Sequence, residues 1–277
     1  MYTLNCNNTL IDLSTPRVMG IINVTPDSFY DGGKTDTSQA ILQQAQKILL
    51  EGATFLDIGG FSSRPGADPI SETEEMQRVL PSIELLIKEF PEVIISVDTF
   101  RSTIAKKAIE AGAAMVNDIS GGMMDEQMLT TVAQLQVPFV MMHMRGTPQT
   151  MTTKTQYENV TREVLRFFSE RIALARKEGI NDIIVDPGFG FSKTRSQSFE
   201  LLNHLELFQH LDLPLLVGIS RKSMIYNTLG VTPQEALNGT TTLHGVALLK
   251  GASILRVHDV KEAVESVLLI LKLRGSV

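Results

Sequence analysis

Polar side chains that could bind a ligand follow several short apolar runs of this sequence, at the point where each run ends. They are Asn23, Ser63, Asp98, Asn117, His143, Asp186, Lys222, Arg256 and His258. Among them, Asp98 and Asp186 could accept a fork of N–H donors, and Lys222 could donate to a carbonyl oxygen. A flat 2-amino-4-oxo pyrimidine ring offers both kinds of group, and a buried polar group left unmatched would cost about 1–3 kcal/mol. The set therefore predicts a selective site for such a heterocycle.

The last apolar run leads to two side chains that suit phosphate. Arg256 and His258 stand at alternate positions, so both can point to the same side of an extended chain. A guanidinium and an imidazole in that place could contact phosphate oxygens. Asn23, after the first run, offers an amide oxygen that could complete a Mg²⁺ ion held mainly by phosphates and water. We therefore predict a phosphate site with Mg²⁺ as cofactor and Asn23 as its protein ligand.

Each of these residues also has a purely structural interpretation. Asp186 precedes Pro-Gly and could belong to a turn, while Ser220 and Ser223 could cap helices. His143 could be a packed histidine with satisfied hydrogen bonds, and Met142 beside it would then pack the floor of a pocket. We interpret Arg221 as a solvated cation without a catalytic role. The number of polar groups at the ends of apolar runs favours a site.

The apolar runs are too short for helices and alternate with helical patterns. They cover 18–22, 54–58, 93–97, 114–116, 138–142, 183–185, 215–219 and 253–255. Eight buried strands, each followed by a helix, indicate a parallel (β/α)8 TIM barrel, because an open sheet commonly stops at five or six strands. The active site of such a barrel lies at the carboxyl ends of its strands, which is where the polar residues stand.

Helical patterns connect these strands. They cover 38–51, 71–90, 102–111, 126–134, 157–178 and 260–273, and further helices follow Asp186 and Ser220. Pro81 could bend or break the second of them. Residues 28–37 are polar, contain Gly32-Gly33 and are expected to form a mobile loop. Residues 3–13 surround the turn pair Asn7-Asn8 and are expected to form a hairpin that closes the bottom of the barrel.

Length and charge limit the possible functions. The 277 residues fit one barrel domain, 1–277, because such barrels need about 250. A net charge of −6 and a pI near 5.4 disfavour a nucleic-acid or anionic membrane partner, and no apolar run approaches the ~20 residues of a membrane span. Cys6 is the single cysteine, so no internal disulfide can form. These features suit an enzyme of small molecules in the reducing cytoplasm.

Five motifs in this order resemble the dihydropteroate synthase family, over nearly the whole chain. They are Asn23-Val-Thr-Pro-Asp27-Ser-Phe29, Ser62-Ser-Arg-Pro-Gly66, Asp186-Pro-Gly-Phe-Gly190, Ser220-Arg-Lys-Ser223 and Arg256-Val-His258. The resemblance implies the transfer of a pterinylmethyl group from 6-hydroxymethyl-7,8-dihydropterin pyrophosphate to p-aminobenzoate, which gives 7,8-dihydropteroate and pyrophosphate. It also implies a homodimer and competition by sulfonamides.

The same resemblance assigns roles to single residues. Pterin would be held by Asp98, Asn117, Asp186 and Lys222. Pyrophosphate would be contacted by Ser63, Arg256 and His258, with Asn23 on Mg²⁺. The p-aminobenzoate site would be shaped by Phe29, Arg64 and Pro65, with Ser223 near the carboxylate. Asn23, Lys222, Arg256 and His258 would be the catalytic groups, because the difficult step is C–O cleavage and no general base is needed.

One departure and two rival functions remain at this stage. Phe61 stands where the family pattern leads us to expect a Glu before Ser-Ser-Arg-Pro-Gly. A barrel that presents methyltetrahydrofolate to a corrinoid protein would share the Asp and Asn groups, but it would not need the phosphate-side residues. A non-catalytic pterin-binding module would bind pterin without releasing pyrophosphate. Because p-aminobenzoate would meet two mobile loops, we expect it to bind after the pterin and pyrophosphate.

Overall fold

Eight parallel strands form the centre of the molecule. The computed structural model describes residues 2–25, 34–61 and 69–275. The strands are β3 (Arg17–Asn23), β4 (Phe55–Gly59), β5 (Ile94–Asp98), β6 (Met115–Asp118), β7 (Phe139–Met142), β8 (Ile183–Asp186), β9 (Leu216–Val217) and β10 (Ile254–Val257). Their order is β8-β7-β6-β5-β4-β3-β10-β9, and a bridge between Val185 and Leu215 joins the two ends. The predicted barrel is confirmed, although β9 is shorter than the run 215–219.

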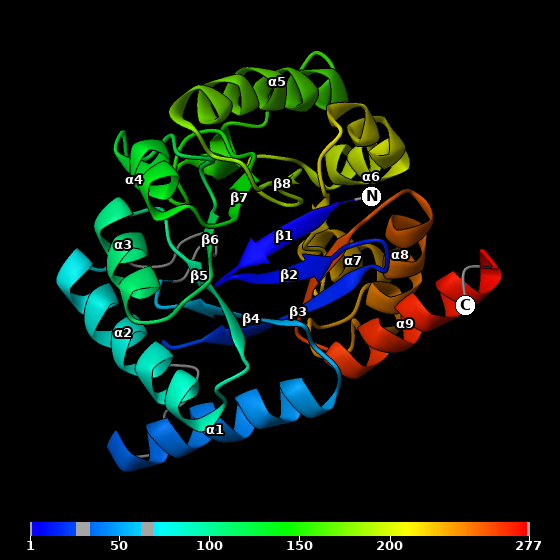
Figure 1. The fold of residues 1–277 in the computed structure, drawn as a ribbon. Coiled ribbons are helices and arrows are strands. Elements are labelled where there is room, and N and C mark those ends of the chain that lie inside the picture. The colour runs from blue at the N-terminus through cyan, green and yellow to red at the C-terminus, as the bar shows by residue number, and fades with distance from the viewer. Residues whose placement is uncertain (1, 26–33, 62–68, 276–277) are drawn as a thin grey trace.

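Helices surround the strands on the outside (Figure 1). They are α1 (Lys34–Leu50), α2 (Glu72–Glu89), α3 (Ser102–Glu110), α4 (Met128–Leu135), α5 (Val160–Glu178), α6 (Arg195–Asn203), α7 (Ser223–Leu229), α8 (Leu237–Leu249) and α9 (Val260–Leu273), with 3-10 helices η2 (Met151–Thr153) and η3 (Leu205–Leu211). Fully buried side chains such as Leu56, Val79 and Ile83 fill the layer between sheet and helices. None of the described helices is long and apolar enough to cross a membrane.

Two helices differ from the sequence-based expectation. The helix α1 begins at Lys34, so the loop predicted to extend to Thr37 is wrong at its end. Its first residues are polar but contain no helix breaker, and polarity alone does not exclude a helix. The helix α2 begins after Ser71, whose hydroxyl accepts from Glu74 N at 3.1 Å, and it runs through Pro81 without a break. Burial of its inner face outweighs the lost hydrogen bond.

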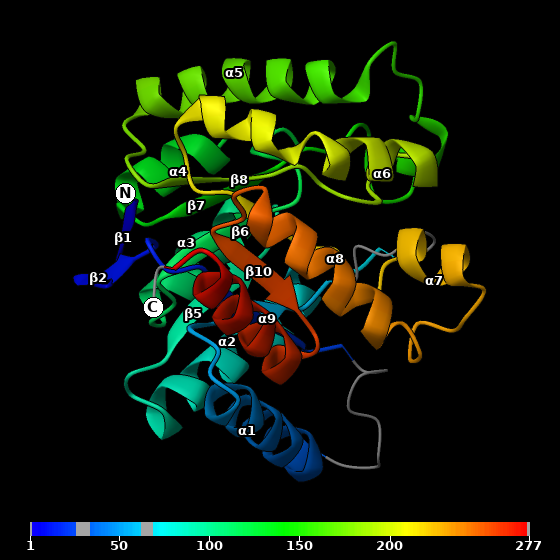
Figure 2. The ribbon, with the colours of Figure 1, turned by 90° about the vertical axis from the view of Figure 1, so that its right-hand side faces the viewer.

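The hairpin of β1 (Thr3–Cys6) and β2 (Thr9–Asp12) closes the bottom of the barrel, as predicted. Asn7 and Asn8 both have positive φ angles, 49° and 65°, which suit a two-residue hairpin turn. Leu4 and Cys6 are each 1% exposed and pack with the strand residues Phe55, Met115, Ile184 and Ile254. Figure 2 shows this hairpin at the end of the barrel opposite the arrowhead of β10. The opposite end is therefore left for a ligand.

The strand register brings the predicted polar residues together. Asn23 pairs with Gly59, Gly59 with Asp98, and Asp98 with Asn117, so one row of the sheet carries all three polar side chains. Asp186 ends β8 and pairs with Met142 of β7. Because parallel strands end at the same edge, these groups lie at the top of the barrel.

Candidate functional site

A buried charge cluster occupies the top of the barrel interior. The Arg256 guanidinium donates from Nε to Asp57 Oδ2 at 2.6 Å and from Nη2 to Asp98 Oδ2 at 2.7 Å. Asn117 Nδ2 donates to the same Asp57 oxygen at 3.1 Å. One cation from β10 thus holds two carboxylates from β4 and β5, which are two and three strands away in the sheet.

Burial changes the pKa of two members of this cluster, Asp98 and Arg256. It raises the pKa of Asp98, an effect that the nearby Arg256 guanidinium opposes. Burial lowers the pKa of Arg256, but the carboxylates of Asp57 and Asp98 outweigh it and raise that pKa overall. Arg256 is therefore always charged. Asp57 is fully buried, and its Oδ1 has no hydrogen-bond partner among the described residues. That oxygen is an acceptor for a ligand N–H group.

Asp57 is a site residue that the sequence reasoning missed. It lies within the run 54–58 rather than after it, so the pattern predicts only that it belongs to a buried strand. A signal was present, because Asp57 is the one charged residue of that run. In a barrel, alternate strand residues face the interior, and a charge two positions before the strand end Gly59 can point there.

Lys222 and Asp186 form the second part of the site. Lys222 Nζ donates to the Phe189 carbonyl at 2.6 Å and lies 4.7 Å from the centre of the Phe191 ring. Asp186 Oδ1 accepts from Gly188 N at 2.8 Å. Gly218, after β9, shows how these groups converge: a Cβ atom there would lie 3.8 Å from Asp186 Oδ2 and 3.9 Å from Lys222 Nζ.

The ionisation of this pair follows from its burial. Burial lowers the pKa of Lys222 to about 8, and the Asp186 carboxylate opposes that shift. Burial also raises the pKa of Asp186, which Lys222 and the Gly188 N–H oppose. At pH 7 the ammonium is therefore mostly charged and can donate to a ring oxygen. Asp186 offers acceptors to ring N–H groups.

Ser220 and Arg221, which follow β9, both bind residues that follow β10, and this differs from the sequence-based expectation. Ser220 Oγ accepts from His258 N at 3.2 Å and lies 3.3 Å from His258 Nδ1, so Ser220 orients His258 instead of capping α7. Arg221 binds both carboxylate oxygens of Asp259, at 2.8 and 2.5 Å. Its interpretation as a simply solvated cation is wrong, because this pair is half-buried. Ser223 is exposed and begins α7.

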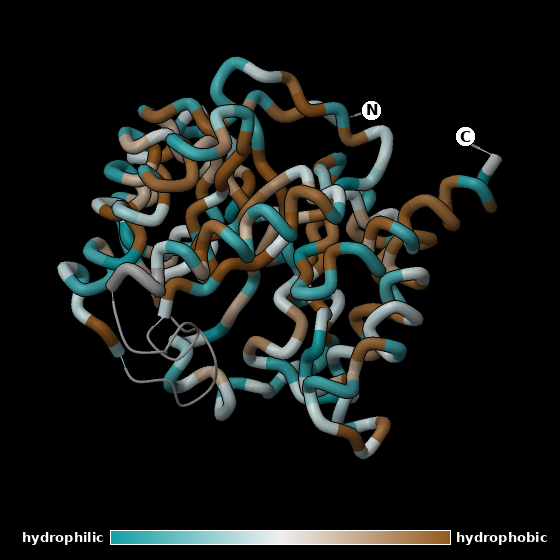
Figure 3. The backbone as a smooth tube through the Cα atoms, turned by 90° about the horizontal axis from the view of Figure 1, so that it is seen from below, coloured by the Kyte–Doolittle hydropathy of each residue, from teal (hydrophilic) through white to brown (hydrophobic). Residues whose placement is uncertain are grey.

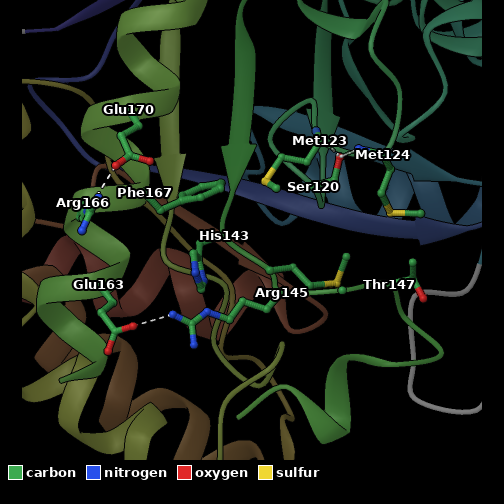
Figure 4. Close-up of a pocket in the computed structure, with 12 residues that line it drawn as sticks. Ser120, Met123, Met124, His143, Arg145, Thr147, Glu163, Arg166, Phe167 and Glu170 are labelled. Atoms are coloured by element: carbon green, nitrogen blue, oxygen red, sulfur yellow. Dashed lines mark hydrogen bonds and ion pairs between the residues drawn. The ribbon is translucent and has the colours of Figure 1, made fainter. Parts of the chain in front are cut away.

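His143 lies outside the charge cluster. It is 2% exposed, meets the Phe167 ring edge-on at 4.8 Å between centroids, and its Nδ1 is 2.8 Å from Lys193 Nζ. Figure 4 shows it in the wall of a separate cavity of about 740 Å³, between Phe167 and the ion pair of Arg145 with Glu163. The interpretation as a packed histidine fits this position.

Met142 and Phe61 border the site through apolar contacts. Met142 is 4% exposed and packs with Ile119, Met144 and Phe191, next to Asp186 in the sheet. Phe61 is buried and meets the Phe100 ring edge-on at 5.4 Å. The predicted residues Phe29, Ser63, Arg64 and Pro65 lie outside the described residues, as does most of the loop 28–37.

Known proteins are similar to this chain in both sequence and fold. The model of the pterin binding enzyme family matches residues 19–258. A dihydropteroate synthase of Escherichia coli strain K12 is 44% identical over 265 residues, which cover 95% of this chain and 93% of that protein.

Two solved structures superpose on almost the whole chain. The dihydropteroate synthase of Yersinia pestis, solved with a sulfonamide drug complex, has a TM-score of 0.93 at 42% identity and covers 99% of this chain and 100% of its own. That of Xanthomonas albilineans, solved with 4-aminobenzoic acid, has a TM-score of 0.92 at 40% identity and covers 99% of this chain and 98% of its own. With the family model, these similarities show that the chain belongs to the dihydropteroate synthase family of pterin-binding enzymes.

Proposed function

We propose that the protein joins 6-hydroxymethyl-7,8-dihydropterin pyrophosphate to p-aminobenzoate and releases 7,8-dihydropteroate and pyrophosphate, a step of folate biosynthesis. The observation that carries this function is the convergence of Asp186, Lys222 and Arg256 around the bare backbone of Gly218, at the top of a barrel of this family. In the reaction the methylene C–O bond breaks with its electron pair leaving on pyrophosphate. A C–N bond forms, and the arylamine nitrogen loses a proton.

The pterin ring matches the donors and acceptors of the cluster. Asp186 would accept the fork of ring N–H groups, and Lys222 would donate to the ring carbonyl. Asp98 and Asn117 would hold the other edge, close to the unmatched Oδ1 of Asp57. The carboxylates also favour the positive charge that develops on the methylene and the ring as the C–O bond breaks.

The leaving group would be stabilised at the exit of β10. Arg256 uses two of its five N–H groups on Asp57 and Asp98, which leaves donors for phosphate oxygens, and His258 stands two residues beyond. The described residues contain no group of three His, Cys, Asp or Glu that could hold a metal. A single amide oxygen from Asn23 fits a Mg²⁺ ion that takes its other ligands from pyrophosphate and water, where it would neutralise developing charge.

The second substrate would lie above the pterin. We assign its site to Phe29, Arg64 and Pro65, with Ser223 near the carboxylate and Ser63 on the pyrophosphate side. The support is the motif resemblance together with the Xanthomonas structure solved with 4-aminobenzoic acid and the Yersinia structure solved with a sulfonamide drug. Sulfonamides should therefore compete with p-aminobenzoate for this protein.

A pyrophosphate-release assay tests the reaction. We expect release only when both the pterin pyrophosphate and p-aminobenzoate are present, with 7,8-dihydropteroate formed in equal amount. Pterin binding without release would identify a non-catalytic module, and methyl transfer to a corrinoid would identify the rival enzyme. Either result would contradict the proposal.

We also propose a single-domain chain, 1–277, that works as a homodimer in the cytoplasm. One eight-stranded sheet takes strands from most of the chain, which supports the single domain. Leu268, Leu269 and Leu273 of α9 are 57%, 71% and 71% exposed, and Figure 3 shows hydrophobic stretches along the C-terminal helix. Such leucines fit an interface with a second copy. Analytical ultracentrifugation tests it: a Leu269→Glu variant should sediment as a monomer, and an unchanged dimer would exclude this helix.

A further inference from the structure

A second lysine lies behind the candidate site, and the reaction as described gives it no role. Lys193 is 7% exposed, and its Nζ lies 2.8 Å from His143 Nδ1. The same nitrogen is 3.0 Å from the carbonyl oxygens of Gly188 and Phe191 and 3.3 Å from that of His143. These hydrogen-bond partners are uncharged atoms of two loops, so Lys193 joins the end of β7 to the loop between β8 and α6.

That loop rests directly on the end of β7. Gly188 has a φ of +70°, and a Cβ atom there would lie 2.1 Å from the His143 carbonyl oxygen, so no side chain fits between the two segments. Two hydrogen bonds join the same segments close by, from His143 N to Asp186 O at 3.0 Å and from Arg145 N to Ser192 Oγ at 2.9 Å. Lys193 donates to both carbonyls, of His143 and of Gly188, and the Gly188 carbonyl also accepts from Phe191 N at 3.1 Å.

Lys193 and Lys222 contact the same short segment, residues 188–191. Gly188 and Phe191 are the two loop residues whose carbonyls accept from Lys193. Phe189, between them, gives its own carbonyl to Lys222 Nζ at 2.6 Å, and the Phe191 ring lies under that ammonium. A shift of this short segment would move both contacts of Lys222 at once, together with the Gly188 N–H that orients Asp186.

Burying Lys193 is energetically costly, which suggests a role in holding the loop after β8. Burial lowers its pKa well below the ordinary value, and only the more distant Asp186 carboxylate opposes this. A buried amine without a paired carboxylate is less favourable than an apolar side chain of the same length would be. We attribute the tolerance of this cost to the hydrogen bonds of Lys193, which fix the conformation of the loop.

We propose that Lys193 is a positioning residue for the pterin site: by fixing the β8–α6 loop on His143, it orients Lys222 and Asp186 without touching the substrate. The inference deepens the proposed function, since the ligand whose affinity it sets is the pterin. Binding of a pterin to the unaltered protein tests that function separately. A protein that binds no pterin would refute the function, and an unaffected variant would refute only the role of Lys193.

The test compares two variants that each remove a side-chain N–H donor from backbone carbonyls next to β8. Lys193→Met acts on the loop after the strand. The matched control, Arg176→Met, acts on the loop before it, where Arg176 donates to the carbonyls of Ile180 and Asn181. Calorimetry with 6-hydroxymethylpterin, well below the melting temperature of each variant, gives the affinity, and thermal unfolding gives the stability.

We expect Lys193→Met to weaken pterin binding by about tenfold to a hundredfold, as for a small misplacement of binding groups, and Arg176→Met to leave it within about twofold. The KM for the pterin substrate should rise more than that for p-aminobenzoate. Lys193→Arg, which keeps donors in the same place, should recover part of the affinity. Equal loss of stability in both variants with unchanged pterin affinity would overturn the proposal.

A milder variant keeps the test decisive if Lys193→Met does not fold. His143→Gln removes the Nδ1 acceptor of Lys193 and lies outside the charge cluster. We expect it to weaken pterin binding measurably, and combining it with Lys193→Arg should cost less than the product of the separate losses. Unchanged affinity in His143→Gln, or fully independent losses, would show that Lys193 does not act through this contact.

Discussion

The two ends of the barrel are both closed by buried side chains, but of opposite character. At the bottom, Leu4 and Cys6 of the hairpin pack with apolar strand residues. At the top, Arg256, Asp57 and Asp98 form a buried ion cluster in which Asp57 Oδ1 has no hydrogen-bond partner within the part of the chain that the structure describes. The strands are the same, so the contrast lies in which residues stand at each end.

The contrast separates stability from binding. Apolar burial stabilises the bottom without directional requirements. The charges at the top are costly to bury, and they are matched only in part by one another. What remains unmatched is available to a ligand. Loss of a residue at the bottom should therefore lower stability alone, whereas loss at the top should lower binding as well.

The largest effect is expected for Arg256→Met, because it leaves two carboxylates buried without their cation. We expect the free energy of unfolding in urea to fall by about 3–5 kcal/mol, together with loss of turnover. Arg166→Met is the control, since Arg166 pairs with Glu170 on the exposed face of α5, and its stability should not change measurably. Similar results for both arginines would mean that the cluster does not hold the top of the barrel.

Leu4→Ala tests the bottom of the barrel. Removing a fully packed side chain should lower the free energy of unfolding by about 2–5 kcal/mol, while pterin affinity of the folded protein stays unchanged in calorimetry. Leu10→Ala, on the same hairpin but 72% exposed, should do neither. A fall in pterin affinity for Leu4→Ala would contradict the separation of the two ends.

Asp186→Asn and its control Asp182→Asn together compare the two ends of β8. An amide cannot accept a fork of N–H groups as a carboxylate does, so pterin binding should weaken by about 1–3 kcal/mol with little change in melting temperature. Asp182→Asn, just before β8, removes a carboxylate that accepts from Asn5 N at 2.8 Å, and should leave pterin affinity unchanged. If pterin affinity survives Asp186→Asn, the pterin assignment is wrong.

The last expected effect is a pH dependence set by Lys222, which is small at pH 7 because the ammonium is mostly charged there. Its pKa of about 8 predicts that pterin affinity falls above pH 8, by about tenfold per pH unit, as the ammonium is lost. Stability moves the other way. Between pH 8 and the ordinary value of 10.5, the unfolded chain holds a proton that the folded chain has released, so stability rises with pH.

Calorimetry and urea unfolding across this range check both signs. Lys222→Met should bind weakly at every pH and show neither trend. A decline of affinity that persists in Lys222→Met would have to come from another group.

The barrel was predictable from the sequence because its signal repeats. Most of the short runs end at a polar residue, as 93–97 does at Asp98, and eight short runs that alternate with helical patterns indicate a closed barrel. Asp98, Asn117 and Asp186 are brought to one mouth as expected. The bottom hairpin followed from Asn7-Asn8, whose preference for positive φ is local chemistry.

What the sequence did not predict depends on contacts between distant residues. Asp57 was missed because its partner Arg256 lies 199 positions away. For the same reason the sequence predicts only a phosphate contact for Arg256, whereas the structure shows that it also binds two carboxylates. Ser220 was considered as a helix cap because capping is a local pattern, whereas its bond to His258 crosses between two strand exits. The start of α1 at Lys34 was missed because polar residues are neutral between loop and helix.

The closure of the barrel at β8 and β9 has a consequence for motion. These strands meet through a bridge between Val185 and Leu215 and a hydrogen bond from Val185 N to Pro214 O at 3.0 Å. Within the described residues this contact line, here called the seam, is shorter than that of any other strand pair in the sheet. Short seams open most readily, and their amide protons exchange fastest with solvent. Asp186 and Lys222 stand on the two sides of this seam, so a pterin bound to both bridges it. A bound ligand would therefore connect β8 and β9 where the sheet has few hydrogen bonds. Amide exchange should then slow most along 215–219 when the ligand binds.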